Sequence, residues 1–379
     1  MSRYVWNHLV AESKRIFRDD KTSTFGPAQQ DKYLTRLRAT TTNEAGEHWL
    51  ASGSSVVQQQ TVRDFAASRA KALKDRKNKV HPAKRAGLPR FKKRGKARAT
   101  LNYTKRGFSL KVDKTTGKLR LHLAGGIIAN VVWSQELPSA PTSVRVYQDS
   151  LGHWYATFRV LRDHPHAPAL EDAVAVGVDW GVKEIATTAC VNLVDGTLDE
   201  STRFDLVHAE HGRAAAEGLA ATQRQMARRK RHKSKPPTSG YTRAAKKAAK
   251  LHKRVARKRK DDARKWAKGL VTASEFIAVE DFKPKFLAKT TMARKSQDAA
   301  ISATKAELVW QAVKHGRTCI LVDPKNTTQD CGACGAKAKQ RMELKDRVFE
   351  CWKCGTARAR DKNSAIVMVA RAGFVPRSR

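Results

Sequence analysis

The chain has 379 residues, and its 76 Lys and Arg against 35 Asp and Glu give a formal net charge of +41. A hydrophobic fraction of 40% is enough for a folded core, which excludes a disordered basic tail, and the apolar runs fall far short of the ~20 residues of a membrane span, which excludes an integral membrane protein. Because self-repulsion of this excess charge opposes folding, we expect a polyanionic partner, and nucleic acid is the obvious candidate.

The first 83 residues are predicted to form helices. They begin without the apolar core of a signal peptide, so secretion is not expected. Side chains recur at helical spacing in two stripes, which are Trp6, Leu9, Val10, Ser13 and Phe17 in the first and Val62, Phe65, Ala66, Ala70 and Leu73 in the second. Gly26-Pro27 and residues 51–54 separate the stripes. A basic, apolar-poor segment broken by proline and glycine, residues 81–98, indicates a charged linker.

Residues 101–160 show an apolar period of two, which indicates β-strands. Phe108–Val112 and Leu119–Leu123 flank a short turn and predict a β-hairpin. Val144–Tyr147 and Trp154–Phe158 predict a second hairpin of the same kind. Regular short strands of this kind suggest a small β-barrel, completed by other segments of the chain.

Strands alternate with helices from residue 171 onward, which predicts an α/β region within a multidomain α+β chain. Strands are expected at residues 173–181, 184–191, 276–280 and 318–322. Helices are expected at residues 213–266, about 299–314 and from 361 onward. The long helical stretch is expected to be interrupted at Pro236-Pro237 and Gly240.

The segment from Arg228 to Lys260 carries 16 Lys and Arg and no acid. A solvated helix of one charge sign repels itself, so a bound polyanion explains this run better. The alternative is an exposed solvated face or a disordered arm. The run therefore predicts contact with a nucleic acid without saying which kind.

Four of the six cysteines have the spacing of a zinc site. They form two C-x-x-C pairs separated by 16 residues, Cys331 with Cys334 and Cys351 with Cys354. Four thiolates at ~2.3 Å close a tetrahedron around Zn²⁺ and leave no open position, so we expect a structural site. Free thiols or two disulfides are the alternatives. The other two, Cys190 and Cys319, lie in apolar segments and are expected to be buried without a chemical role.

Three acids lie at the ends of predicted secondary-structure elements. Asp179 and Glu280 each end an apolar strand, and Asp361 opens a helix seven residues after the last cysteine. Separately, they could be a turn former, a solvated strand end and a helix N-cap. Clustered together, three carboxylates would repel one another unless a cation lay between them. Hard oxygen ligands select Mg²⁺ or Mn²⁺, and two such ions ~4 Å apart can hydrolyse a phosphodiester. Strand alternation sends Asp281 to the opposite face from Glu280, so only one of the two can join the site.

The motifs resemble those of a known family. AVAVGVDWGVKEIA, FIAVEDF and the segments DPKNTTQDCGACG and FECWKCGTARARDKNSAI resemble the three RuvC motifs of TnpB proteins and of the related type V CRISPR effectors. The resemblance implies that Asp179, Glu280 and Asp361 are the catalytic acids and that the cysteines form a zinc ribbon before the third motif. The third motif departs from the expected pattern, with Lys362 and Ser364 where Arg and Ala are expected.

The resemblance extends upstream in the same order along nearly the whole chain. SRYVWNHLVAESKR resembles the start of a helical recognition lobe, and LPRFKKRGKAR with the two hairpins resembles a wedge barrel. Family members usually begin with a strand and a turn some tens of residues before the first segment, so either the start is shortened or one wedge strand is missing. The domains implied are the recognition lobe at 1–83, the wedge at 84–170, an RNase H-like RuvC domain at 171–323 and 358–379, and the zinc ribbon at 324–357.

The implied activity is RNA-guided DNA cleavage by two metal ions, in a cytoplasmic, nucleoid-associated protein encoded by a transposable element. The implied partners are a guide RNA (omega RNA or CRISPR RNA) and double-stranded target DNA, with no membrane contact, a monomeric chain, Mg²⁺ or Mn²⁺ as cofactor and structural Zn²⁺. Nucleic-acid contacts are expected at Arg90, Lys92, Lys93, Arg94, Arg228, Arg229, Lys230, Arg231, Arg254, Arg257, Lys258 and Arg259.

Three other functions are weighed against this one. A compact type V CRISPR effector would share the chemistry and differ in the source of its guide. A nuclease-inactive, RNA-guided repressor would be marked by the loss of a motif acid, and all three acids are present. A DNA-strand transferase would need a covalent Tyr or Ser nucleophile, and no motif of the sequence indicates one.

Overall fold

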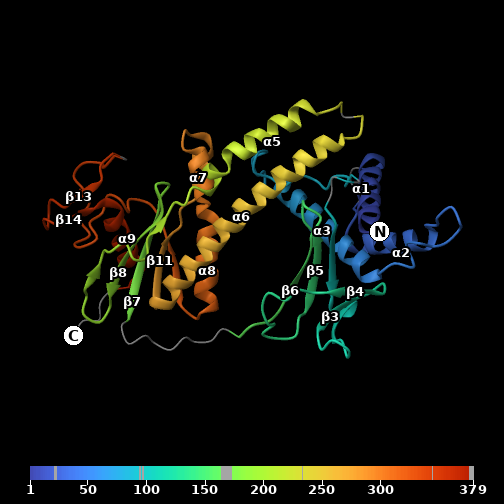
Figure 1. Cartoon of the computed structure of the whole chain (residues 1–379), viewed down its shortest axis with the longest axis horizontal. Helices are drawn as coiled ribbons and strands as arrows, with labels where there is room; N and C mark the ends of the chain where they lie inside the picture. Colours follow the sequence, from blue (N-terminus) through green and yellow to red (C-terminus); the bar gives the residue numbers. More distant parts are fainter. Residues whose placement is uncertain are drawn as a thin grey trace. The chain divides into compact units, whose positions relative to one another are not determined.

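The computed structural model describes residues 1–20, 24–93, 95, 98–163, 173–232, 234–343 and 345–374 (Figure 1). Its contacts divide the chain into two compact units, Met1–Arg162 and Asp163–Arg379. The domain boundary expected at residues 170 and 171 lies outside the described residues. None of the described helices is both long enough and apolar enough to cross a membrane.

The first unit begins with three helices, α1 (Ser2–Asp19), α2 (Pro27–Thr40) and α3 (Ser55–Lys77). The predicted stripes meet near their N-terminal ends, where Trp6 and Phe65 pack edge to face with ring centroids 5.6 Å apart. Helix α3 begins after Ser54, whose hydroxyl accepts a hydrogen bond from the Val57 amide. Toward the helix C-termini the stripes leave this core, and Phe17 there is 60% exposed.

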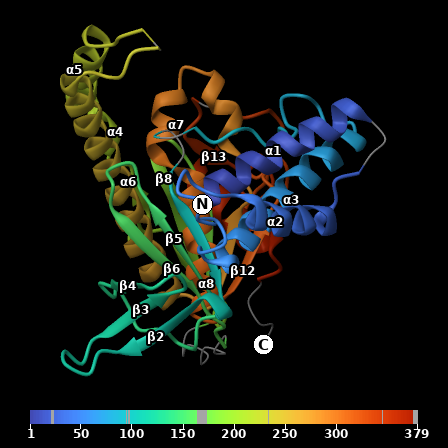
Figure 2. The same cartoon turned by 90° about the vertical axis from the view of Figure 1, so that its right-hand side faces the viewer.

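The rest of the first unit is β-structure (Figure 2). Its strands are β1 (Thr100–Thr104), β2 (Phe108–Val112), β3 (Leu119–Leu123), β4 (Ile127–Asn130), β5 (Ser143–Gln148) and β6 (Trp154–Arg159). Both predicted hairpins are confirmed, with Leu110 opposite Leu121 in the first and Val146 opposite Ala156 in the second.

These strands form two antiparallel sheets, β1-β5-β6 and β2-β3-β4, and the described residues show no strand pairing between them. The short 3₁₀ turn η1 (Lys105–Gly107) carries the chain from one sheet to the other. Tyr103, Leu121 and Val144 pack in one core that both sheets share with Val57 of α3. Within the described residues, the expected closed barrel is therefore not seen, and two sheets around one core stand in its place.

The second unit is built on a mixed sheet of order β10-β8-β7-β11-β12, with β9 paired to β8. Its strands are β7 (Val174–Trp180), β8 (Glu184–Asn192), β9 (Leu198–Asp199), β10 (Leu206–Val207), β11 (Phe276–Glu280) and β12 (Thr318–Val322). Strand β11 runs parallel to both β7 and β12, whereas β8 is antiparallel to β7. The four strands expected from the sequence are thus confirmed, and the bounds of β11 and β12 match the expectation.

The helices of this unit are α4 (His211–Ala214), α5 (Ala216–Arg228), α6 (Ser239–Ala273), α7 (Ala293–Ala299), α8 (Ile301–Lys314) and α9 (Arg360–Arg371), with the 3₁₀ turn η2 (Pro284–Lys289) before α7. Helices α6 and α8 cover one face of the sheet, and α9 covers the other. Val178 packs with Leu270 of α6 and Leu308 of α8 on one face, and Ala175 packs with Met368 of α9 on the other.

Gly177 lets α9 approach the sheet very closely. A Cβ atom at this position would lie 1.7 Å from the Ala365 carbonyl oxygen, so no larger residue fits without displacing the helix. This contact holds the first turn of α9 near the end of β7.

The long helical stretch expected at residues 213–266 folds mainly as two helices, α5 and α6, which pack side by side (Figure 1). The break at Pro236-Pro237 is confirmed, but the expected interruption at Gly240 is wrong. The Thr238 hydroxyl accepts a hydrogen bond from the Tyr241 amide at 3.0 Å and starts α6 there, which leaves Gly240 in the first helical turn.

Candidate functional site: a carboxylate cluster and a cysteine cluster

The register of two parallel strands brings the first two acids together. Val178 of β7 lies opposite Val279 of β11, so Asp179 and Glu280, the next residue of each strand, are neighbours on one face. That face is the one covered by α9, whose first turn carries Asp361. Three acids from distant parts of the sequence therefore gather at one end of the sheet.

Asp179 is strongly affected by its surroundings. Burial raises the pKa of Asp179 well above its ordinary value, and the negative charges of Glu280 and Asp361 raise it further. The Arg360 guanidinium opposes this effect and lowers the pKa. Glu280 and Asp361 are thus near enough for their charges to oppose ionisation of Asp179, which is the situation that a bound cation relieves.

Glu280 is 7% exposed, and burial raises its pKa to about 7. The Trp180 amide donates to Glu280 Oε2 at 3.3 Å, which lowers the pKa, and the charge of Lys305 has the same effect. The Trp180 indole also donates to the backbone carbonyl of Glu280 at 3.0 Å. The side chain and the backbone of Glu280 are therefore both fixed by the end of β7.

Asp281 has a different environment from its neighbour. Its carboxylate accepts hydrogen bonds from Lys305 at 2.7 Å and pairs with Lys283 at 3.1 Å. These two lysines lower the pKa of Asp281. A carboxylate already neutralised by two cations is a poor metal ligand, so Glu280 is the better candidate of the two.

Asp361 is the most accessible of the three acids, with a side chain that is 41% exposed. It is not the N-cap of α9, because Ala359 occupies that position and Asp361 lies inside the first turn. Its Oδ1 atom accepts two hydrogen bonds from Arg360, from Nε at 3.0 Å and from Nη2 at 2.9 Å. The alternative reading of Asp361 as a helix cap is therefore excluded.

The donor set fits a hard divalent cation such as Mg²⁺ or Mn²⁺, because it consists of carboxylate oxygens, and burial opposes the ionisation of Asp179 and Glu280 in the absence of a cation. Among the described residues, however, only the four cysteines already bring three or more metal-ligating atoms close enough to hold an ion. The three acids must approach one another further to share a cation.

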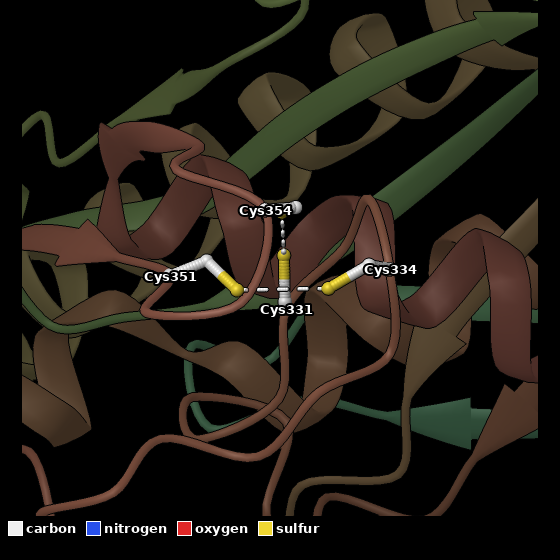
Figure 3. Close-up of side chains that lie close together, drawn as sticks. All are labelled: Cys331, Cys334, Cys351 and Cys354. Atoms are coloured by element: carbon white, nitrogen blue, oxygen red, sulfur yellow. Dashed lines mark hydrogen bonds between the residues drawn. The ribbon is translucent and has the colours of Figure 1, made fainter.

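The cysteine cluster has the dimensions of a zinc site (Figure 3). All four Sγ atoms lie within 4.8 Å of one another, with 3.7 Å between Cys331 and Cys354 and 3.6 Å between Cys334 and Cys351. A tetrahedron with Zn–S bonds of ~2.3 Å has edges of ~3.8 Å, so the four thiols are close to the arrangement that Zn²⁺ requires. The disulfide alternative is excluded, because these sulfurs are too far apart to be bonded.

Each cysteine pair lies in its own backbone turn, and the two turns are of the same kind. The amide of Cys331 donates to the Ala336 carbonyl and that of Cys351 to the Thr356 carbonyl, each at 2.9 Å. Gly335 closes the first turn with a φ of +72°, which only glycine adopts without strain. The short strands β13 (Val348–Glu350) and β14 (Ala357–Ala359) complete the ribbon.

The ribbon docks directly on α9. The Asn363 side chain, which is fully buried, accepts a hydrogen bond from the Gly332 amide at 2.9 Å and donates to the Asp330 carbonyl at 2.7 Å. One buried amide side chain thus fixes the first cysteine turn to the helix that carries Asp361.

The two remaining cysteines lie in the sheet, where Cys190 is buried as expected and Cys319 is only partly buried. Burial raises the pKa of both thiols, Cys190 in β8 and Cys319 in β12, to about 11. A thiol with so high a pKa carries little thiolate at neutral pH and is a weak nucleophile.

Comparisons with known proteins agree with this picture. Residues 157–291 match the family OrfB_IS605, described as "Probable transposase", and residues 304–368 match the Cas12f1-like TNB domain. A "Putative RNA-guided DNA endonuclease" of Streptomyces pristinaespiralis is 27% identical over 90% of this chain and 78% of its own length. The "Putative RNA-guided DNA endonuclease InsQ" of Escherichia coli K12 is 26% identical over 82% of this chain and 72% of its own length.

These matches confirm the resemblance to TnpB proteins. In fold, the chain is similar to the protein in a cryo-EM structure of a Cas12f1-sgRNA-target DNA complex, with a TM-score of 0.56 and 14% sequence identity. The likeness covers 97% of this chain and 80% of the other.

The basic residues that were expected to contact nucleic acid fall into two groups. The exposed group comprises Arg90, Lys93, Arg228, Arg229, Lys230, Arg231, Arg254, Arg257 and Lys258. The other two described members have structural partners. The ammonium group of Lys92 lies 3.6 Å from the Trp6 ring centroid, and Arg259 donates to the Asp298 carboxylate at 3.0 Å. Arg94 lies outside the described residues.

A buried ion pair next to Asp361 was not among the features expected from the sequence. Lys362 donates to the backbone carbonyls of Thr188 and Ser201, each at 2.7 Å, and to the Asp205 carboxylate at 3.0 Å. Asp205 also accepts from the Thr188 amide at 2.7 Å. The only sequence signal was that Lys362 departs from the residue expected in the third motif of TnpB proteins.

Replacing one zinc ligand tests the cysteine cluster. We expect about one zinc per chain in the parent and almost none in Cys351→Ser, because three thiolates leave the tetrahedron open. Elemental analysis of the purified protein measures this directly. Cys319→Ser is the matched control and is expected to retain its zinc. Equal zinc content in Cys351→Ser and the parent would show that the cluster is not a metal site.

The raised pKa of Glu280 predicts a pH dependence of stability without divalent cations. The folded chain keeps the Glu280 proton up to pH about 7, whereas the unfolded chain loses it near the ordinary value of 4.5. The stability that this group contributes is therefore complete below pH 4.5 and is lost as the pH rises to about 7. We expect a smaller loss of melting temperature between pH 5 and pH 8 in Glu280→Gln than in the parent.

Calorimetry in metal-free buffer measures this difference, with Asp281→Asn as the control. Because the pKa of Asp281 is lowered, its contribution is present at neutral pH and is lost only on acidification, so Asp281→Asn should keep the parent's behaviour between pH 5 and pH 8. The same pH dependence in Glu280→Gln and the parent would contradict the assigned environment of Glu280.

Proposed function

We propose that this chain is an RNA-guided DNA endonuclease of the TnpB type. The observation that carries the proposal is the convergence of Asp179, Glu280 and Asp361 at one end of a sheet, where the charges of Glu280 and Asp361 raise the pKa of Asp179. Such a cluster is expected where a protein binds divalent cations for phosphoryl chemistry. The family-model match and the names of the two bacterial relatives support the same activity.

The three acids would hold Mg²⁺ or Mn²⁺, and the four cysteines would hold structural Zn²⁺. When bound, two ions at such a site activate a water and stabilise the leaving oxygen of a phosphodiester. The residues of this chain keep the site ready for them. Trp180 fixes Glu280 through two hydrogen bonds, and Lys305 neutralises the neighbouring Asp281, which leaves Glu280 to face the cluster.

The proposed architecture follows the family. The sheet of the second unit with α6, α8 and α9 would be the RuvC-like nuclease domain, with the ribbon at residues 324–357 inserted before its last helix. In the first unit, residues 1–83 would be the recognition lobe and residues 84–170 the wedge. The two three-stranded sheets around one core are compatible with an oligonucleotide-binding module.

Guide RNA and target DNA are the proposed partners. The exposed basic residues at the end of α5 and along α6 offer phosphate contacts that do not depend on sequence. Base pairing with the guide would then select the target, while the protein contacts backbone and shape. The transposase family match favours a transposon-encoded guide over one from a CRISPR array.

Removing the first acid separates cleavage from RNA binding. We expect Asp179→Ala to lower divalent-dependent cleavage of guide-matched DNA by more than about 100-fold, since even the outer-shell partners of a metal are worth up to that much. The copurified RNA, measured by the A260/A280 ratio before and after nuclease treatment, should be unchanged. Asp281→Ala is the matched control, because its carboxylate is paired with lysines away from the cluster, and it should still cleave. Parent-level cleavage by Asp179→Ala would refute the assignment.

A further inference from the structure

One buried arginine connects the ribbon to the third acid of the cluster. Arg360, the first residue of α9, is 8% exposed. Its Nε and Nη2 atoms both donate to Oδ1 of Asp361, and its Nη1 atom donates to the backbone carbonyls of Glu343 and Asp346, each at 3.0 Å. A single guanidinium therefore bridges the ribbon loop and the Asp361 carboxylate.

The loop that Arg360 contacts lies between the two cysteine pairs. It is closed on itself, because the Asp346 carboxylate accepts from the Glu343 amide at 2.7 Å and the Asp346 amide donates to the Glu343 carbonyl at 3.1 Å. The Arg360 amide adds a bond to the Arg347 carbonyl at 2.9 Å. The carbonyls that Arg360 contacts are in place only while the ribbon is folded. A ribbon of this size depends for its folding on the metal that its four cysteines bind.

Asp361 needs such a support more than the other two acids do. Glu280 is buried and held by Trp180, whereas the Asp361 side chain is 41% exposed and lies on the first turn of a helix. A carboxylate with rotational freedom must lose that freedom to bind a cation, which weakens binding. Because both N–H groups of Arg360 converge on Oδ1, the orientation of Asp361 is set and Oδ2 is the oxygen that a cation would take.

We propose that Arg360 is a positioning residue, which orients Asp361 for cation binding and does so only while the ribbon is folded around its metal. The proposal rests on the proposed function, in which Asp361 is a cation ligand. It couples two metal sites that share no ligand, since the folded ribbon supplies the carbonyls that hold Arg360. The positive charge of Arg360 would by itself repel a cation, so positioning and simple electrostatics predict opposite effects of its removal.

The test compares Mn²⁺ binding by the full-length chain with its copurified RNA, measured as free Mn²⁺ by electron paramagnetic resonance. Binding that Asp179→Ala abolishes is counted as binding at the carboxylate cluster. We expect about 10- to 100-fold weaker Mn²⁺ binding in Arg360→Gln, the range typical of losing a residue that orients a metal ligand. Arg360→Lys should recover only part of this, because an ammonium group cannot span the carbonyls and the carboxylate together.

The matched control is Arg371→Gln, on the same helix. Arg371 also anchors the base of the ribbon, through the backbone carbonyls of Asp323 and Lys325 and the Asp330 carboxylate, but it makes no contact with Asp361. Its Mn²⁺ binding should equal that of the parent. Zinc content is measured for every variant. If Arg360→Gln loses zinc, Mn²⁺ binding is instead compared between Arg360→Lys and the parent.

A double-mutant cycle tests the coupling. Cys351→Ser should weaken Mn²⁺ binding in the parent and have little further effect in Arg360→Gln, because both changes remove the same support. Unchanged or tighter Mn²⁺ binding in Arg360→Gln with zinc retained would overturn the proposal, as would a parent without any Asp179-dependent binding. Failure of the parent to cleave guide-matched DNA would count against the proposed function, while the Mn²⁺ comparison would still decide the role of Arg360.

Discussion

The parallel register of β7 with β11 is the constraint on which the candidate site depends. It sets two acids side by side at the carboxyl ends of neighbouring strands, which is where open α/β sheets bind their ligands. Neither acid ionises easily there, because burial raises the pKa of both Asp179 and Glu280. A fold that relied only on its own packing would gain nothing from this arrangement, whereas a fold that binds a cation between the acids recovers the cost of their ionisation.

The third acid depends on a different set of contacts. Gly177 allows α9 to lie directly against β7, so that the first turn of α9 is brought to the end of the strand. The cysteine ribbon precedes this turn and is joined to it by Asn363 and Arg360. The two clusters have complementary roles. The thiols are arranged for a closed, structural metal site, whereas the carboxylates must still converge on a cation and leave room for a substrate.

Features that depend on neighbouring residues could be predicted from the sequence. Apolar runs bounded by acids gave the strands at residues 276–280 and 318–322, and the cysteine spacing follows from the geometry of a tetrahedral metal. The choice of Glu280 over Asp281 came from strand alternation, and the lysines beside Asp281 support it. That Asp179, Glu280 and Asp361 bind cations stays a prediction.

Features that depend on contacts between distant segments were not predicted. Lys362 donates to the Thr188 carbonyl and forms an ion pair with Asp205, although both partners lie more than 150 residues away in the sequence. No local sequence pattern predicts such a partner. In the same way, alternation shows that a strand has one buried face but does not show which strands pair, so two separate sheets could not be distinguished from a barrel. Lys92 and Arg259 belonged to basic runs, yet Trp6 and Asp298 engage their side chains within the fold.

The most direct measurement of the central claim is anomalous diffraction at the manganese edge from crystals of the full-length chain grown with Mn²⁺. The account predicts manganese between Asp179, Glu280 and Asp361, with carboxylate oxygens of all three residues at ~2.0–2.2 Å from an ion, the range for small octahedral divalent cations. The contradicting result is a crystal with zinc at the four cysteines and no manganese at the three acids. In such a crystal, the carboxylate oxygens of the three acids would lie too far apart to be bridged by two ions roughly 4 Å from each other.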